Sequence, residues 1–176
     1  EGDRYFAEGN WARAAKAFDA AIRRDSAAVP AGAFGKRAAV YILVHDLRGG
    51  LAFVRGVAKR YHPTAPEILE QEALLLWELG QRVEAVRVAE VVVAAAPTTW
   101  SSQRLLGEFY AARDPARTAA AYQLYLAHRP ADREDKDVLP RARLGLAALA
   151  LARAALRAGA AAAAPRQYAA AAEQFE

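Results

Sequence analysis

The sequence predicts an all-α chain, an α-solenoid in which antiparallel helix pairs follow one another in series. Three features predict it: the composition, a regular series of prolines, and a second set of breaks between the prolines. Of the 176 residues, 47 are alanine and 11 are glycine, so the composition favours helix, because alanine is the strongest helix former. The chain is 55% hydrophobic and 25% charged, which is typical of a folded chain rather than a disordered one.

The prolines give the period of the array. Four of them stand 33, 34 and 33 residues apart: Pro30, Pro63, Pro97 and Pro130. Each follows one apolar helical stretch and precedes another, where a proline can end one helix and open the next. A second break falls near the middle of each interval, at Gly49-Gly50, Gly80 and Asp114-Pro115. Two helices in a period near 34 residues indicate a helical repeat; armadillo and HEAT units are longer, and the Thr-Pro-Leu-His turn of ankyrin units is missing.

The expected helices follow from the apolar spacing between these breaks. Their spans are about 1–8, 11–24, 31–46, 51–61, 66–79, 82–95, 100–112, 115–128, 140–158 and 166–176. Gly9 ends the first helix at a tight turn, and a lengthened helix at 140–158 precedes a loop over 159–165. The expected N-caps are Thr64, Thr98 and Thr99. The helices form a single array without separate domains, in units of roughly 1–29, 30–63, 64–97, 98–130 and 131–176.

In the first unit, small and aromatic residues resemble the tetratricopeptide repeat (TPR) family in order and spacing: Gly2, Tyr5, Gly9, Trp11, Ala14, Phe18, Ala21 and Asp25. The third and fourth units repeat the pattern, but the second departs from it, because Arg55 and Leu51 stand where the family has an aromatic and a small residue. The fifth unit holds an extra stretch of about 14 residues. The resemblance implies a right-handed superhelix of about five repeats, the first and last truncated, and hence a segment of a larger protein.

No pattern of catalytic or metal-binding residues stands out, so an enzyme is not expected. The chain has no cysteine, which excludes disulfides, thiolate zinc sites and cysteine catalysis and leaves the compartment open. The three histidines, His45, His62 and His128, lack ligand spacing, and the segment 132–137 (DREDKD) lacks the glycine and final acidic residue of a calcium loop. There is no glycine-rich phosphate loop and no apolar run long enough to span a bilayer. No metal, cofactor or membrane insertion is therefore expected.

The resemblance to TPR proteins implies that the first helix of each unit lines a concave groove that holds a peptide or protein partner. Aligning the units predicts these groove residues: Phe6, Lys36, Val40, Glu70, Leu74, Trp77, Glu78, Arg104 and Glu108. Trp77 is the most informative of them, because Leu76 occupies the packing place beside it and an accessible tryptophan is an effective anchor. The alternative is that Trp77 packs against the next repeat. Lys36 and Arg104 could join a carboxylate clamp, but its asparagines are absent, so a partner of mixed or apolar character is expected.

Charge is spread unevenly along the chain. Residues 1–63 hold 11 basic and 6 acidic residues, residues 64–140 hold 8 and 12, and residues 141–176 hold 5 and 2. This basic–acidic–basic series could favour self-association. Nucleic acid is not an expected partner, because the basic residues are scattered and the acidic centre would repel phosphate.

We therefore expect a non-enzymatic protein-interaction scaffold that forms part of a larger bacterial protein. The 20 arginines against 4 lysines, with the alanine excess, suggest a GC-rich bacterial genome. The stretches KRYHP (59–63) and RQYAAAAEQFE (166–176) are similar to repeats of envelope-associated TPR lipoproteins. This similarity adds the cell envelope or periplasm to the cytoplasm as alternatives for the compartment. The alternatives are a regulatory TPR array of a multidomain signalling or transcription-regulating protein, and a self-assembling spacer.

Overall fold

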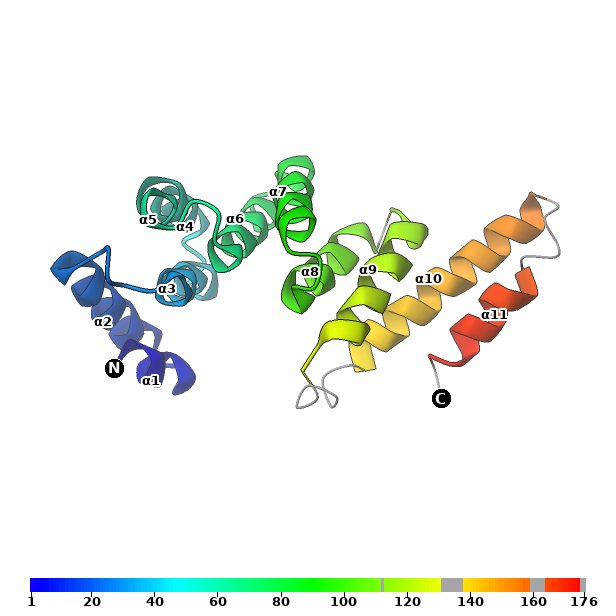
Figure 1. The fold of residues 1–176 in the computed structure, drawn as a ribbon, viewed down its shortest axis with the longest axis horizontal. Coiled ribbons are helices and arrows are strands. Elements are labelled where there is room, and N and C mark those ends of the chain that lie inside the picture. Colours follow the sequence, from blue (N-terminus) through cyan, green and yellow to red (C-terminus); the bar gives the residue numbers. More distant parts are fainter. Residues whose placement is uncertain (112, 131–137, 159–163, 175–176) are drawn as a thin grey trace. The chain divides into compact units, whose positions relative to one another are not determined.

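The computed structural model shows an all-α chain, which confirms the predicted fold class (Figure 1). The residues that it describes are 1–111, 113–130, 138–158 and 164–174, and none of these forms a strand. The chain consists of two compact units, Glu1–Val92 and Val93–Glu176. The acidic segment 132–137, which lacks the pattern of a calcium loop, and residues 159–163 of the expected loop lie outside the described residues.

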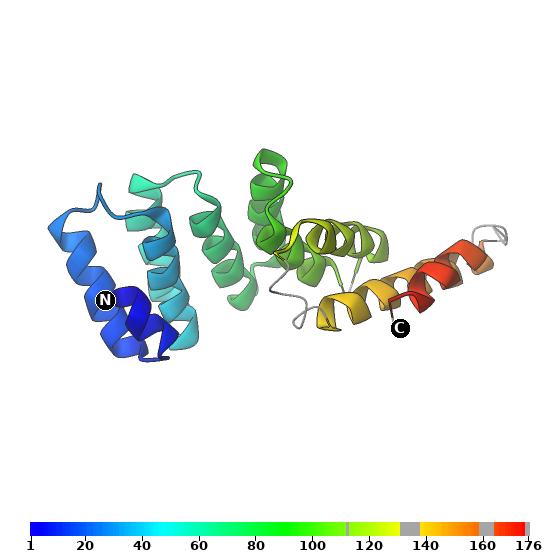
Figure 2. The ribbon, with the colours of Figure 1, turned by 60° about the horizontal axis from the view of Figure 1, so that its bottom comes forward.

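The first unit is built from helix pairs that contact one another in sequence order. Its elements are α1 (Gly2–Ala7), α2 (Trp11–Arg24), α3 (Ala31–Leu43), α4 (Leu47–Phe53), the π-helical η1 (Val54–Ala58), α5 (Lys59–Tyr61), α6 (Pro66–Glu78) and the greater part of α7 (Arg82–Ala95). The helix α3 lies at the centre, because it contacts α1, α2, α4 and α6. In Figure 2 the blue and teal helices of this unit stand side by side.

The second unit contains α8 (Trp100–Tyr110), α9 (Pro115–His128), α10 (Val138–Arg157) and α11 (Ala164–Ala172). Each of these helices contacts the next one along the chain. In the pair α8–α9, the glycine of α8 allows a close approach, because a Cβ atom on Gly107 would lie 2.8 Å from the Tyr122 ring. The lengthened helix predicted for the last unit is confirmed as α10, which is 20 residues long.

The turn inside each of the first three helix pairs has the same backbone geometry. At its centre stands one residue with positive φ: Gly9 (φ 72°), His45 (φ 59°) or Gly80 (φ 78°). In each case the amide of this residue donates to the carbonyl three residues back, and the next amide donates to the carbonyl five residues back. This is the Schellman motif, which satisfies carbonyl groups at a helix C-terminus. The predicted turns at Gly9 and Gly80 are thereby confirmed.

The turn of the second pair was predicted at Gly49-Gly50, and that prediction is wrong. His45 occupies the left-handed position that glycine fills elsewhere, so α4 begins at Leu47, four residues before the expected start. The Asp46 carboxylate caps it, with Oδ1 accepting from the Gly49 amide at 3.0 Å. Gly50 lies inside the helix for a packing reason: a Cβ atom there would lie 2.7 Å from Leu75 Cδ2 and 2.8 Å from Tyr41 Cβ.

The correct start of α4 also changes the alignment of the second unit. Counting eight residues from the capping residues Asn10, Asp46 and Asp114 leads to Phe18, Val54 and Tyr122, all buried. Val54, and not Arg55, therefore holds the place of the aromatic residue. Gly50, and not Leu51, holds the place of the small residue.

The expected caps Thr64 and Thr98 are also wrong, since Ala65 and Thr99 precede α6 and α8. Thr99 does stand at the start of α8, but its side chain makes no capping hydrogen bond.

Ion pairs at equivalent positions join successive helix pairs of the first unit. Asp19 on α2 accepts from Arg37 on α3, with 2.7 Å between Oδ1 and Nε. One pair further on, Arg55 on η1 donates from Nε to Glu72 Oε1 on α6 at 2.9 Å. Asp19 and Arg55 each lie nine residues after their capping residue, and Arg37 and Glu72 each lie eight residues before the left-handed turn residue. The same contact is thus made twice, with the acidic residue on the earlier helix in the first case and on the later helix in the second. A different order of the helix pairs would bring Asp19 to Glu72 or Arg55 to Arg37, so the two contacts favour the observed order.

Replacing His45 by glycine is expected to stabilise the first unit by about 0.5–1 kcal/mol, because a side chain at positive φ is strained and glycine is not. Urea denaturation followed by far-UV circular dichroism measures the change. His128→Gly is the control: His128 is the last residue of α9, so glycine there should lower stability or leave it unchanged. A lower stability of H45G would contradict the strain argument.

Candidate partner-binding surface

The first helices of the pairs in the first unit adjoin one another. A side-chain ion pair joins α1 to α3, with 2.6 Å between Lys36 Nζ and Asp3 Oδ1. The helices α3 and α6 approach closely at Gly35, where a Cβ atom would lie 3.2 Å from the Glu67 carbonyl oxygen. We call the outward side chains of these helices the first-helix face: Asp3, Phe6, Lys36, Glu67, Glu70, Leu74, Trp77 and Glu78.

The apolar part of this face lies on α6. Glu67, Glu70, Leu74 and Trp77 recur at three- and four-residue intervals, so they form one stripe along the helix. Leu74 and Trp77 are half-buried, and Glu67 and Glu78 are exposed. The opposite side of α6 is buried in the unit. Accessible apolar side chains therefore lie between carboxylates.

Trp77 lies beside Arg82, a residue that sequence reasoning missed. The Arg82 guanidinium carbon is 5.1 Å from the centre of the Trp77 ring, within the range of a cation–π contact. The two residues flank the turn at Gly80, which reverses the chain and brings them together. A basic residue shortly after the left-handed turn residue is the signal that could have predicted this contact.

Two of the predicted residues at the α1 and α3 end take part in core packing, Val40 fully and Phe6 in part. Val40 is only 3% exposed and belongs to a buried cluster with Ala14 and Phe18, so its prediction as a groove residue is corrected. It turns inward because α3 must cover α2 as well as α6. Phe6 is half-buried against the same cluster, with its ring centre 5.3 Å from that of Trp11.

The other two predicted residues, Arg104 and Glu108, lie in the second unit on α8. They form an ion pair with 3.7 Å between Nη1 and Oε1. Arg143 of α10 also approaches Glu108, at 3.8 Å between Nη1 and Oε1, and donates to the Tyr122 hydroxyl at 3.0 Å. Burial raises the pKa of Tyr122, against the effect of the Arg143 hydrogen bond. Arg104, Glu108 and Arg143 therefore find their partners within the second unit, where the two arginines share one carboxylate.

The described part of the chain offers no metal centre, since it holds no group of three His, Asp or Glu residues placed to bind an ion. Two of the histidines lie at helix ends: His128 ends α9, and His62 follows α5 and donates from Nε2 to the Val29 carbonyl at 2.8 Å. Among the described helices, none combines the length and the apolar character that crossing a membrane requires.

No protein-family model matches the sequence, and no curated protein matches it. Solved structures do match. A crystal structure of MamA is 14% identical with a TM-score of 0.66, over 99% of this chain and 94% of that one. YrrB, described as a TPR protein with an unusual peptide-binding site, is 13% identical with a TM-score of 0.61, over 98% and 82% of the two chains. A TPR protein from Parabacteroides merdae is 15% identical with a TM-score of 0.59, over 99% and 70%. These structural similarities show that the chain has the fold of TPR proteins.

Proposed function

We propose that this chain, which has the TPR fold, is a non-enzymatic scaffold that binds a partner protein or peptide on the first-helix face of the first unit. One observation carries the proposal: α6 presents two half-buried apolar side chains, Leu74 and Trp77, between the exposed carboxylates of Glu67 and Glu78. Tryptophan is enriched among the residues that contribute most to binding energy. The peptide-binding site named for YrrB supports this function by analogy of fold.

The charges on the face favour a particular kind of partner. Lys36 is paired with Asp3, so the α1–α3 end contributes little net charge. The exposed Glu67 and Glu78 give α6 an acidic character, since they outnumber the single Arg82 beside Trp77. A segment that places an apolar side chain against Leu74 and Trp77 and basic side chains beside the glutamates is complementary to it. The chain would perform this role as part of a larger bacterial protein.

The experiment begins with a library of random peptides selected on the wild-type chain, followed by affinity measurements on the best binder. Trp77→Ala is expected to weaken binding about tenfold or more, because a truncated anchor costs over 1 kcal/mol. Leu146→Ala is the control, since Leu146 is an exposed apolar residue of the second unit (60% exposed). Circular dichroism checks that both variants fold. Equal affinities of the wild type and W77A would sink the proposal, as would recovery of peptides without basic residues.

A further inference from the structure

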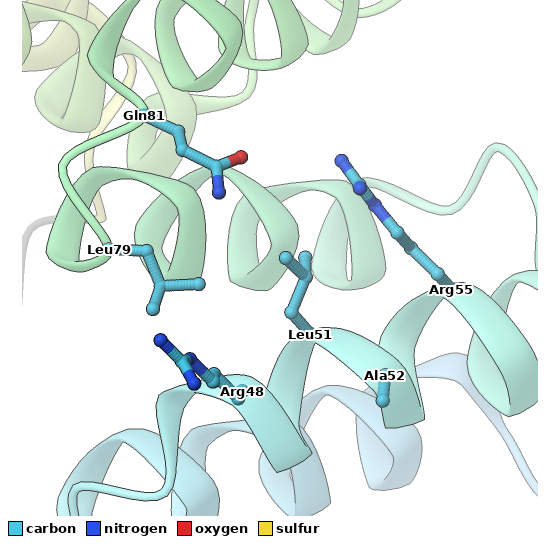
Figure 3. Close-up of a pocket in the computed structure, with 6 residues that line it drawn as sticks. All are labelled: Arg48, Leu51, Ala52, Arg55, Leu79 and Gln81. Carbon is cyan, nitrogen blue, oxygen red and sulfur yellow. The ribbon is translucent and has the colours of Figure 1, made fainter.

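A second candidate site lies in the first unit, between the second helix of the α3–α4 pair and the turn that follows α6. It is a pocket of about 420 Å³ lined by Arg48, Leu51, Ala52, Arg55, Leu79 and Gln81. Figure 3 shows Arg48, Leu51 and Arg55 extending from α4 and η1 toward the turn between α6 and α7, from which Leu79 and Gln81 extend. Its volume falls within the usual range of ligand pockets.

The floor of the pocket is a single helical stripe. Three of its side chains, Leu51, Ala52 and Arg55, lie three, four and seven residues after Arg48. All four therefore share one side of the helix. The start of α4 at Leu47 places Gly50 and Val54 in the core. It leaves this stripe at the edge of the core, with Arg48 and Arg55 exposed and Leu51 partly buried against the core. Arg55 lies within the π-helical η1, and π-helical turns occur frequently at functional sites.

The two arginines of the pocket differ in their partners. Arg55 donates from Nε to Glu72 and from Nη2 to Glu84 Oε1, the latter at 2.7 Å. The hydrogen bond to Glu72 is the main cause that raises the pKa of Arg55. Arg48 is exposed, and among the described residues its guanidinium has no hydrogen-bond or ion-pair partner.

Among the charged side chains that line the pocket or join the ion pairs of Arg55, cations outnumber anions by one. Lys59 also pairs with the buried Glu72, at 3.1 Å between Nζ and Oε2. The cations Arg48, Arg55 and Lys59 thus face the anions Glu72 and Glu84. A ligand with one negative charge neutralises this excess, whereas a phosphate dianion would bring one negative charge more than the excess.

We propose that this pocket binds a peptide segment of a partner protein in which an acidic side chain stands next to a leucine-like side chain. The Arg48 guanidinium suits bidentate recognition of the carboxylate, and the exposed Gln81 amide can donate a further hydrogen bond. Leu51, Ala52 and Leu79 provide the apolar wall for the neighbouring side chain. This site is independent of the first-helix face and prefers the opposite charge.

The test uses two short peptides, acetyl-Ala-Leu-Glu-Ala-amide and its neutral Gln counterpart, titrated into the ¹⁵N-labelled full chain. NMR follows the Nε–H signals of the arginines and the side-chain amide of Gln81. The Glu peptide is expected to shift the Arg48 and Gln81 signals, and the Gln peptide is expected to bind more weakly. Arg48→Gln should weaken binding of the Glu peptide about twofold to fivefold, the range for a solvent-exposed ion pair.

Arg23→Gln is the matched control, because Arg23 is exposed on α2 and lies outside the pocket. It should leave the affinity of the Glu peptide unchanged. The proposal is overturned if the Glu and Gln peptides bind alike, or if R48Q and R23Q have the same effect. It is also overturned if inorganic phosphate shifts the same signals at equal or lower concentration, since that would indicate a general anion site.

Discussion

Phe34→Ala is expected to lower the free energy of unfolding of the first unit by about 3–5 kcal/mol, the usual cost of truncating a buried phenylalanine. Phe34 is fully buried on α3. It belongs to the hydrophobic cluster that includes Ile22 of α2, Val54 of η1 and Leu75 of α6. One side chain therefore contacts a cluster drawn from three successive helix pairs, and its loss leaves a cavity where those pairs meet.

Aromatic contacts add to this burial. The ring centre of Phe34 lies 6.3 Å from that of Phe53, 6.0 Å from that of Tyr61 and 5.2 Å from that of His62. These distances lie within the range of favourable ring pairs. Because α4 and α5 are short, we expect their packing to depend on Phe34 more than on helix propensity.

Urea denaturation followed by far-UV circular dichroism measures the effect of F34A. Val83→Ala is the control, because Val83 is 83% exposed and such substitutions change stability by no more than about 0.5 kcal/mol. Since repeat proteins unfold unit by unit, the first unit is followed separately by the hydrogen exchange of α3 amides. A loss below about 1 kcal/mol in F34A, a value typical of less buried residues, would contradict the central place given to Phe34.

Gly50→Val is expected to destabilise the first unit by about 2–3 kcal/mol, a cost at the upper end for overpacked sites. A Cβ atom at Gly50 would meet Leu75 Cδ2 and Tyr41 Cβ at 2.7 and 2.8 Å. The Leu75 methyl group can swing away, but Tyr41 Cβ is fixed to the backbone of α3. The helices α3 and α4 must therefore separate to admit the valine, and the modest gain in helix propensity over glycine does not offset this.

Gly56→Val is the matched control for G50V. Gly56 lies in the same helical segment, and nothing comes within 4 Å of a Cβ atom built on it. Its substitution should change stability by no more than about 0.5 kcal/mol, as at other open surface positions. Unfolding of G50V and G56V at the same urea concentration would contradict the close approach of α4 to α3 and α6 at Gly50.

The sequence predicts the helix pairs well because their limits depend on local chemistry. Prolines and glycines act on their own backbone, so the breaks at Pro30, Pro63, Gly9 and Gly80 could be located without knowing the tertiary structure. The alanine-rich composition was likewise enough to predict that the chain is all-α. The resemblance of the first unit to TPR proteins identified the fold, which the solved structures bear out.

The errors have two causes: a residue in an unusual backbone conformation, and contacts with parts of the chain that are distant in sequence. His45 fills a position that glycine usually takes, so the sequence around Gly49-Gly50 suggested the turn four residues too late. Gly50 is small because Tyr41 and Leu75 approach it, and neither is a neighbour in sequence. For the same reason the burial of Val40 depends on α2, which a single-helix pattern does not reveal.

The central claim is that a partner binds on α6 beside Trp77, and the three tryptophans allow a direct test of it. Trp77 lies on the first-helix face, Trp11 begins α2 against Phe6, and Trp100 begins α8 with its ring centre 6.2 Å from that of Tyr125. The measurement is ¹⁹F NMR of the full chain labelled with 5-fluorotryptophan, with signals assigned by Trp→Phe substitution, during titration with the selected basic peptide. We predict that the Trp77 signal shifts most and that the Trp100 signal stays in place. A Trp77 signal that does not move at saturation, while Trp11 or Trp100 shifts, would contradict the account.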